Sequence, residues 1–193
     1  MSQPPLPSPP PSGPAQTVPA PAVRHKPRRL AGDRGPPPLL ALTWATFFGA
    51  GYVPVAPGTA GTAAAIPLWW LLSTAGPWVY LLATAAVTLT GIAAAGRAGR
   101  YFGVADSGHI VIDEVAGYLV TMALMPRTAF AMVTGFVFFR LCDVLKPWPA
   151  GFFDRAPRWK NGAGVVLDDL FAGVWALGLT WAAVLAKERL LGS

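Results

Sequence analysis

The run from Pro77 to Gly96, PWVYLLATAAVTLTGIAAAG, contains no charged side chain in 20 consecutive residues. A helix rises about 1.5 Å per residue, so a run of this length matches the roughly 30 Å hydrocarbon core of a bilayer. A second apolar run, LFAGVWALGLTWAAVLA at residues 170–186, is also long enough to span and is followed by Lys187 and Arg189. These two runs predict a membrane protein.

The composition supports this interpretation, because 53% of the residues are hydrophobic and only 12% are charged, whereas charged residues make up about a quarter of an ordinary soluble domain. Four shorter apolar segments accompany the two long runs, at residues 39–53, 63–76, 115–125 and 128–139. None shows the alternating pattern of a β-strand. We therefore expect an all-α fold, a multi-helical membrane bundle with several transmembrane or interfacial helices.

Between the first two short segments, PVAPGTAGT at residues 54–62 is rich in proline and glycine. Such a composition predicts that one helix ends here and another begins.

Residues 1–38 include PPLPSPPPSGPA and hold too few large apolar side chains to pack, so we expect a disordered tail before a helical, membrane-embedded domain at residues 39–193. The tail accounts for +4 of the formal charge of +6, through Arg24, Lys26, Arg28, Arg29 and Arg34 against Asp33. A basic cluster directly before a hydrophobic segment predicts attraction to anionic lipid and a cytoplasmic position, and no nucleic-acid binding.

Four carboxylates lie within or beside the apolar segments. Asp113 and Glu114 are adjacent in IVIDEVAG, and Asp168 and Asp169 are adjacent in LDDLFAG. An ionised side chain at the centre of a bilayer costs about 3 kcal/mol even on the mildest scale. These acids therefore either lie at the aqueous interface or are compensated by a cation.

Small residues follow each acidic pair by about one helical turn: Gly117 follows the first pair, and Ala172 and Gly173 follow the second. Small residues let helices in membranes approach closely, so the spacing predicts that the two acidic turns meet where their helices cross. Such carboxylates repel each other unless a hard divalent cation lies between them, and ligand sets made only of oxygen suit Mg²⁺. The alternative is two solvated helix starts, where the helix dipole favours acids.

The stretch FRLCDVLKPWP at residues 139–149 places an acid between two bases. Arg140 and Asp143 are three residues apart and share a helix face, and Pro147 predicts that this helix ends near Lys146. These side chains form either a structural ion pair at a helix end or a functional site. In the second case Asp143 is a metal ligand and the two bases hold a phosphate.

Four motifs resemble, in order along the chain, those of the phosphatidylglycerophosphatase A family: PVAPGTAGT, DEVAG, FRLCDVLKPWP and LDDLFAG. Four separate blocks over roughly residues 45–185 make the resemblance specific. It implies a Mg²⁺-dependent membrane enzyme that removes the terminal phosphate of phosphatidylglycerophosphate and leaves phosphatidylglycerol. The motif positions are occupied here by Asp113, Glu114, Arg140, Asp143, Lys146, Asp168 and Asp169. We expect it in a bacterial cytoplasmic (inner) membrane, with the active site on the cytoplasmic side.

Hydrolysis of a phosphate monoester requires neutralisation of the dianion, activation of a water and protonation of the leaving alkoxide. The expected metal ligands are Glu114, Asp143, Asp168 and Asp169. The expected phosphate-binding groups are Arg140, Lys146, Thr59 and the amides around Gly58 and Gly61 at a helix start. Asp113 is then the carboxylate left for proton transfer. Without the resemblance, PGTAGT is better interpreted as a helix-breaking turn.

His109 is a further candidate for acid–base chemistry. The other histidine, His25, lies in the tail, so a two-histidine phosphotransfer mechanism is not supported and we expect His109 to be a loop residue near the site. Two other functions remain as alternatives, a small membrane transporter and a non-catalytic membrane assembly protein. The acids lie at segment edges rather than throughout the segments, which favours an enzyme.

Overall fold

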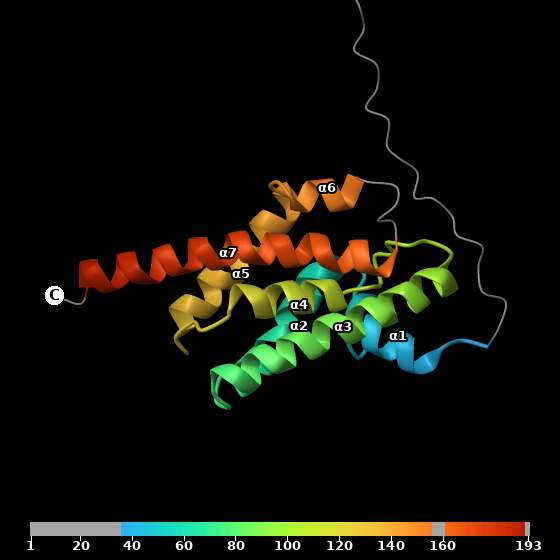
Figure 1. Ribbon diagram of the computed structural model, residues 1–193, viewed down its shortest axis with the longest axis horizontal. Coiled ribbons are helices and arrows are strands. Elements are labelled where there is room, and N and C mark those ends of the chain that lie inside the picture. Colours follow the sequence, from blue (N-terminus) through green and yellow to red (C-terminus); the bar gives the residue numbers. More distant parts are fainter. Residues whose placement is uncertain (1–35, 156–160, 192–193) are drawn as a thin grey trace, which may run out of the picture.

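The computed structural model describes residues 36–155 and 161–191 (Figure 1). Its elements are all helical, in the order α1 (Leu39–Ala45), the 3₁₀ helix η1 (Ala50–Tyr52), α2 (Pro57–Leu72), α3 (Pro77–Phe102), α4 (Ile112–Thr121), α5 (Ala129–Leu145), α6 (Ala150–Arg155) and α7 (Gly162–Leu191). The all-α prediction is thus confirmed for the part of the chain that the structure describes. Most of the predicted tail lies outside it.

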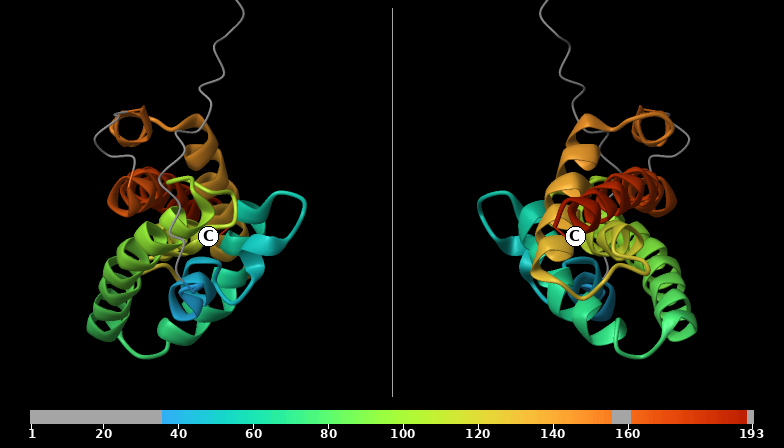
Figure 2. Two further views of the ribbon diagram at one scale, coloured as in Figure 1. Left: turned by 90° about the vertical axis from the view of Figure 1, so that its right-hand side faces the viewer. Right: turned by 90° about the vertical axis from the view of Figure 1, so that its left-hand side faces the viewer.

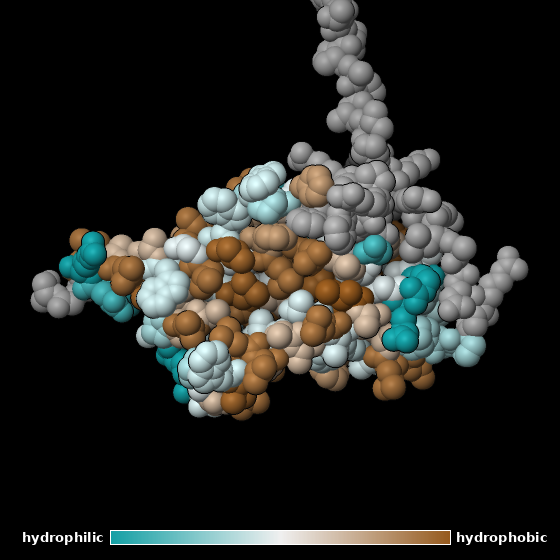
Figure 3. Space-filling model, viewed as in Figure 1, coloured by the Kyte–Doolittle hydropathy of each residue, from teal (hydrophilic) through white to brown (hydrophobic). Residues whose placement is uncertain are grey.

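Two helices, α3 and α7, are long and apolar enough to cross a membrane. α3 begins with Pro77 and ends at Phe102, followed by Gly103, whose φ of 70° is the left-handed conformation that often closes a helix. Between these ends, large apolar side chains such as Leu82 and Leu89 are exposed. Figure 3 shows a broad hydrophobic band across the middle of the molecule, with hydrophilic residues toward its two ends. Together these features fit the membrane protein that the sequence predicts.

The short helix α4 lies at the centre of the bundle. Eight of its ten residues are buried, as expected for a helix that is apolar nearly all round. It packs against α2, α3 and α7, and Figures 1 and 2 show α7 (red) running beside it. Because α4 is enclosed in this way, the carboxylates of its first turn are held inside the protein.

Helix α5 carries FRLCDVL and ends where the sequence predicts. Its last residue is Leu145, and Lys146 caps it with a φ of 45° just before Pro147. A residue before proline is disfavoured in the helical conformation, which explains this boundary.

The N-terminal part of the domain departs from the expected helix boundaries. Residues 39–53 do not form one helix, because α1 ends at Ala45 and Phe47, Phe48 and Gly49 all have positive φ. The break in PVAPGTAGT is confined to residues 54–56, and α2 begins at Pro57, so that GTAGT is helical. Proline is tolerated in a first turn, where its missing N–H would have no partner within the helix.

Candidate active site

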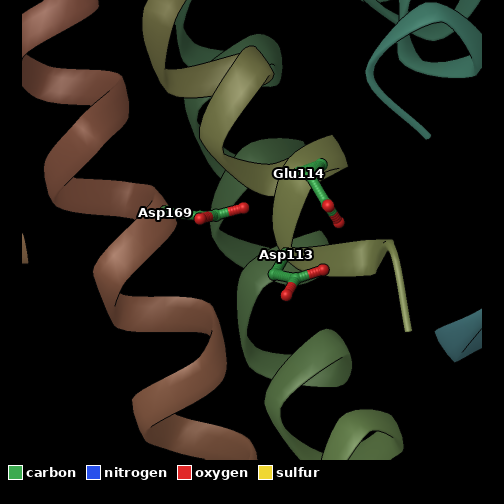
Figure 4. A group of neighbouring side chains, drawn as sticks. All are labelled: Asp113, Glu114 and Asp169. Carbon is green, nitrogen blue, oxygen red and sulfur yellow. The ribbon is translucent and has the colours of Figure 1, made fainter. Parts of the chain in front are cut away.

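Three carboxylates from two helices converge in the structure (Figure 4). Asp113 and Glu114 belong to the first turn of α4 and Asp169 to α7. One oxygen from each of the three side chains lies within 4.8 Å of the others. Asp113 and Asp169 are only 7% and 4% exposed. The two acidic turns therefore meet inside the protein, and the two solvated helix starts are not what the structure shows.

Glycines make this meeting possible. A Cβ atom on Gly173 of α7 would lie 2.4 Å from the carbonyl oxygen of Gly117 on α4, and a Cβ on Gly117 would lie 2.7 Å from the carbonyl oxygen of Asp169. The Thr121 hydroxyl lies within hydrogen-bond distance of the carbonyl oxygens of both glycines, at 3.0 and 3.3 Å. The predicted close crossing of the two acidic helices is confirmed, and α4 and α7 touch backbone to backbone just below the carboxylates.

A guanidinium group borders the three carboxylates. Arg140 Nη1 lies 2.8 Å from Asp143 Oδ2 within α5 and 3.8 Å from Glu114 Oε1 on α4. Asp143 is also close enough to Asp169 for the two carboxyl groups to interact. The predicted pairing of Arg140 with Asp143 is confirmed, and it connects α5 to the acidic cluster.

A second ion pair lies beside the first. The Lys146 ammonium group donates a hydrogen bond to Asp168 Oδ2, and the other oxygen of Asp168 accepts the backbone N–H of Asp169 at 3.1 Å. The structure thus brings all five predicted acids into one region, but the acids whose oxygens lie closest together are not the same set as the expected metal ligands. Asp113 joins the innermost group, whereas Asp168 lies with Lys146 and Asp143 with Arg140.

Two oxygens of the innermost carboxylates lack hydrogen-bond partners. Asp113 Oδ1 and Glu114 Oε2 are buried and have no hydrogen-bond partner among the described residues. Burial raises the pKa of Asp113 well above its usual range, and the neighbouring Glu114 raises it further. Burial also raises the pKa of Glu114. Buried acids of this kind are balanced by protons or by a cation, and three oxygens at this spacing could hold a hard divalent ion.

The start of α2 completes the site. A Cβ atom on Gly58 would lie 2.1 Å from Glu114 Oε1 and 3.1 Å from Arg140 Nη1, so only glycine leaves room for both side chains. The amides of Gly58 and Thr59 are in the first turn of α2, where N–H groups have no partner within the helix. Phosphate binding by these groups stays a prediction.

Gly61 has a visible packing role. A Cβ atom there would lie 2.6 Å from the Cβ atom of Val111, the residue that precedes α4. Its amide lies in the second turn of α2, where backbone N–H groups are used by the helix itself. Gly61 therefore sets how closely α2 approaches the start of α4.

Gly58→Ala is expected to lower kcat/KM about 10- to 100-fold, because the new methyl group must displace Glu114 or Arg140 and misplacement by about 1 Å has effects of this size. The measurement is phosphate release by the purified variant in detergent. Gly178→Ala is the matched control, since nothing lies within 4 Å of a Cβ at that α7 position. Equal activities of the two variants would show that Gly58 does not shape the site.

His109 lies in the loop before α4 and outside the group of three carboxylates. Its Nδ1 atom is 3.1 Å from the carbonyl oxygen of Gly51, and its ring packs against the rings of Tyr52 and Phe102. These contacts connect the loop to η1 and the end of α3, as a structural residue would.

Comparison with known proteins agrees with the family resemblance of the motifs. The chain matches the phosphatidylglycerophosphatase A family over residues 43–184. It is 39% identical to phosphatidylglycerophosphatase A of Escherichia coli K12 over 71% of this chain and 79% of the relative. The corresponding protein of Haemophilus influenzae is 35% identical over 72% of this chain and 85% of the relative.

A relative from Bacteroides thetaiotaomicron, provisionally named a phosphatidylinositol-3-phosphatase, is 33% identical over 72% of this chain and 91% of its own length. No solved structure matches the chain. The extent of the family match and the two named relatives lead to one conclusion: the chain belongs to the phosphatidylglycerophosphatase A family.

Proposed function

We propose that this protein removes the terminal phosphate monoester of phosphatidylglycerophosphate and releases phosphatidylglycerol. The observation that carries the proposal is the convergence of three carboxylates, two of them buried, from α4 and α7, beside the Arg140 and Lys146 side chains. The names of the two relatives with 39% and 35% identity supply the substrate. A lipid substrate also suits a protein whose site lies on membrane helices.

We infer that the site works with a bound Mg²⁺, held by Asp113, Glu114 and Asp169. The two buried oxygens without hydrogen-bond partners and the all-oxygen ligand set support this assignment. When bound, the ion would supply positive charge to the phosphate and lower the pKa of a water molecule. Asp143 and Asp168, which were also expected among the ligands, adjoin this group through Asp169.

The cationic side chains act on the phosphate. Arg140 has a planar guanidinium group that can donate two parallel hydrogen bonds to a phosphoryl group, and its 2.8 Å contact with Asp143 orients it. Lys146 is oriented in the same way by Asp168 and contributes a second positive charge. Asp113, the carboxylate expected to transfer a proton to the leaving alkoxide, is assigned to the metal instead, because one of its oxygens lies within 4.8 Å of an oxygen of Glu114 and of Asp169.

The site lies toward one end of the bundle, and we propose that this end faces the cytoplasm of a bacterial inner membrane. Gly162 at the start of α7 contacts Gly96 near the end of α3, so Arg97 and Arg100 lie at the site end. At the other end, Lys187 of α7 lies over the Phe130 ring. In the sequence, further basic residues precede α1 and separate α6 from α7, and an excess of basic residues beside membrane helices marks the cytoplasmic face.

Phosphate release from a panel of lipids tests the substrate. Purified protein in detergent with Mg²⁺ is expected to hydrolyse phosphatidylglycerophosphate at least about tenfold faster than phosphatidylinositol 3-phosphate or phosphatidic acid, since differential contacts of about 1.4 kcal/mol give this ratio. If phosphatidylinositol 3-phosphate is hydrolysed equally fast, the substrate would instead be assigned from the name of the Bacteroides relative. No hydrolysis of any of the three lipids would favour the transporter or assembly protein.

A further inference from the structure

A groove of about 520 Å³ lies between α1 and α3, outside the carboxylate site. Its walls include Leu40, Trp44 and Ala93, and a single charged residue, Arg97, contributes to its lining. The Trp44 indole donates a hydrogen bond to the Thr90 hydroxyl at 3.0 Å, so these two polar groups satisfy each other. Arg97 is therefore the polar group that the groove offers to a ligand.

The groove continues into a stripe along α3. Leu82, Ala86, Leu89, Ala93 and Arg97 are spaced three or four residues apart and are all exposed. Residues at this spacing share one face of a helix. The face is apolar over most of its length and ends in one cation.

The position of Arg97 along α3 matches the depth of lipid headgroups. It is the first charged residue after the uncharged run from Pro77 to Gly96, whose length equals the roughly 30 Å thickness of a bilayer core. A guanidinium group at this boundary lies level with the phosphates of the lipid, to which arginine donates strong hydrogen bonds. When the phosphate of a lipid lies at this level, its acyl chain lies along the apolar face of α3.

We propose that the α1–α3 groove binds one anionic phospholipid, with its phosphate on Arg97 and an acyl chain along the exposed face of α3. This lipid is distinct from the substrate in the carboxylate site, and the proposal does not depend on which lipid is hydrolysed. The carbonyl oxygen of Ala45, the last residue of α1, accepts the N–H of Val111 at 2.9 Å, directly before α4. A lipid that holds α1 against α3 therefore also supports the start of α4.

Native mass spectrometry of the full chain tests this proposal. The protein is held in detergent with equal amounts of phosphatidylglycerol and phosphatidylcholine that carry the same acyl chains, and the lipid that stays bound after release from the detergent is identified. The wild-type protein should retain one phosphatidylglycerol preferentially. Arg97→Gln should reduce this preference about fivefold, the effect of one basic residue at an anionic lipid surface. Ala93→Phe, which fills the groove, should remove the bound lipid of either headgroup.

Arg100→Gln is the matched control, because Arg100 is exposed on the same helix but does not line the groove. An equal loss of preference in Arg97→Gln and Arg100→Gln would mean general surface attraction and would overturn the proposal. Retention of the lipid in both Arg97→Gln and Ala93→Phe would place it in the carboxylate site instead. If the wild-type protein forms a dimer without bound lipid, and Ala93→Phe abolishes that dimer, the groove binds a second copy of the chain instead.

Discussion

Asp169→Asn is expected to lower kcat for phosphate release by about three orders of magnitude while the protein stays folded. The substitution keeps the shape of the side chain but removes one of the three charges at the point where α4 and α7 cross. Stabilisation of transition-state charge by a metal site amounts to several kcal/mol, and each 1.4 kcal/mol changes a rate about tenfold. The effect should therefore appear in kcat rather than in KM alone.

Two further measurements decide how this result is interpreted. The thermal unfolding midpoint of Asp169→Asn in detergent should equal or exceed that of the wild-type protein, because the neutral amide relieves repulsion among crowded buried carboxylates. Asp106→Asn is the control, since Asp106 is an exposed acid in the loop before α4. If Asp169→Asn keeps a kcat within about tenfold of wild type, Asp169 is not part of the catalytic site.

Gly173→Val is expected to destabilise the protein by about 3 kcal/mol and to abolish measurable activity. Even the first added carbon would lie 2.4 Å from the Gly117 carbonyl oxygen, so α4 and α7 must separate and Asp169 moves away from Asp113 and Glu114. Overpacked interiors typically lose 1 to 3 kcal/mol, and here the obstacle is backbone that cannot rotate away. A loss of this size lowers the thermal midpoint by roughly 5 to 10 °C.

Gly178→Val separates the effect of the crossing from that of valine in a helix. Gly178 is five residues further along α7, and nothing lies within 4 Å of a Cβ there, so this variant should keep the wild-type midpoint within a few degrees and should stay active. Similar losses in both variants would indicate that α7 itself tolerates no valine. In that case the close approach to Gly117 would not be the cause.

The spacing of residues along single helices predicted much of this structure. The pairing of Arg140 with Asp143 follows from a three-residue separation on one helix face, and the end of α5 follows from the effect of Pro147 on Lys146. The meeting of the two acidic turns was predictable because Gly117 and Gly173 each follow their acids by about one turn. These signals come from residues that are close together in the sequence, so few alternative arrangements compete with the observed one.

Features that depend on how helices pack together were beyond the sequence. The glycines of PGTAGT suggest a broken helix when they are considered alone, yet Gly58 makes room for Glu114 and Arg140, and Gly61 for Val111. The grouping of Asp113 with Asp169 depends on how α4 is rotated about its axis among the surrounding helices. Two adjacent acids in a sequence do not define this rotation. No periodicity distinguishes a glycine that ends a helix from one that allows another helix to approach.

The dependence of phosphate release on a divalent cation tests the account most directly. The purified protein, treated with a chelator and then dialysed, should release no phosphate from phosphatidylglycerophosphate, and added Mg²⁺ should restore the rate with saturation. Asp169→Asn should require a much higher Mg²⁺ concentration or fail to respond. Full phosphate release in the presence of the chelator would contradict the account, because the three clustered carboxylates would then serve a reaction that needs no cation.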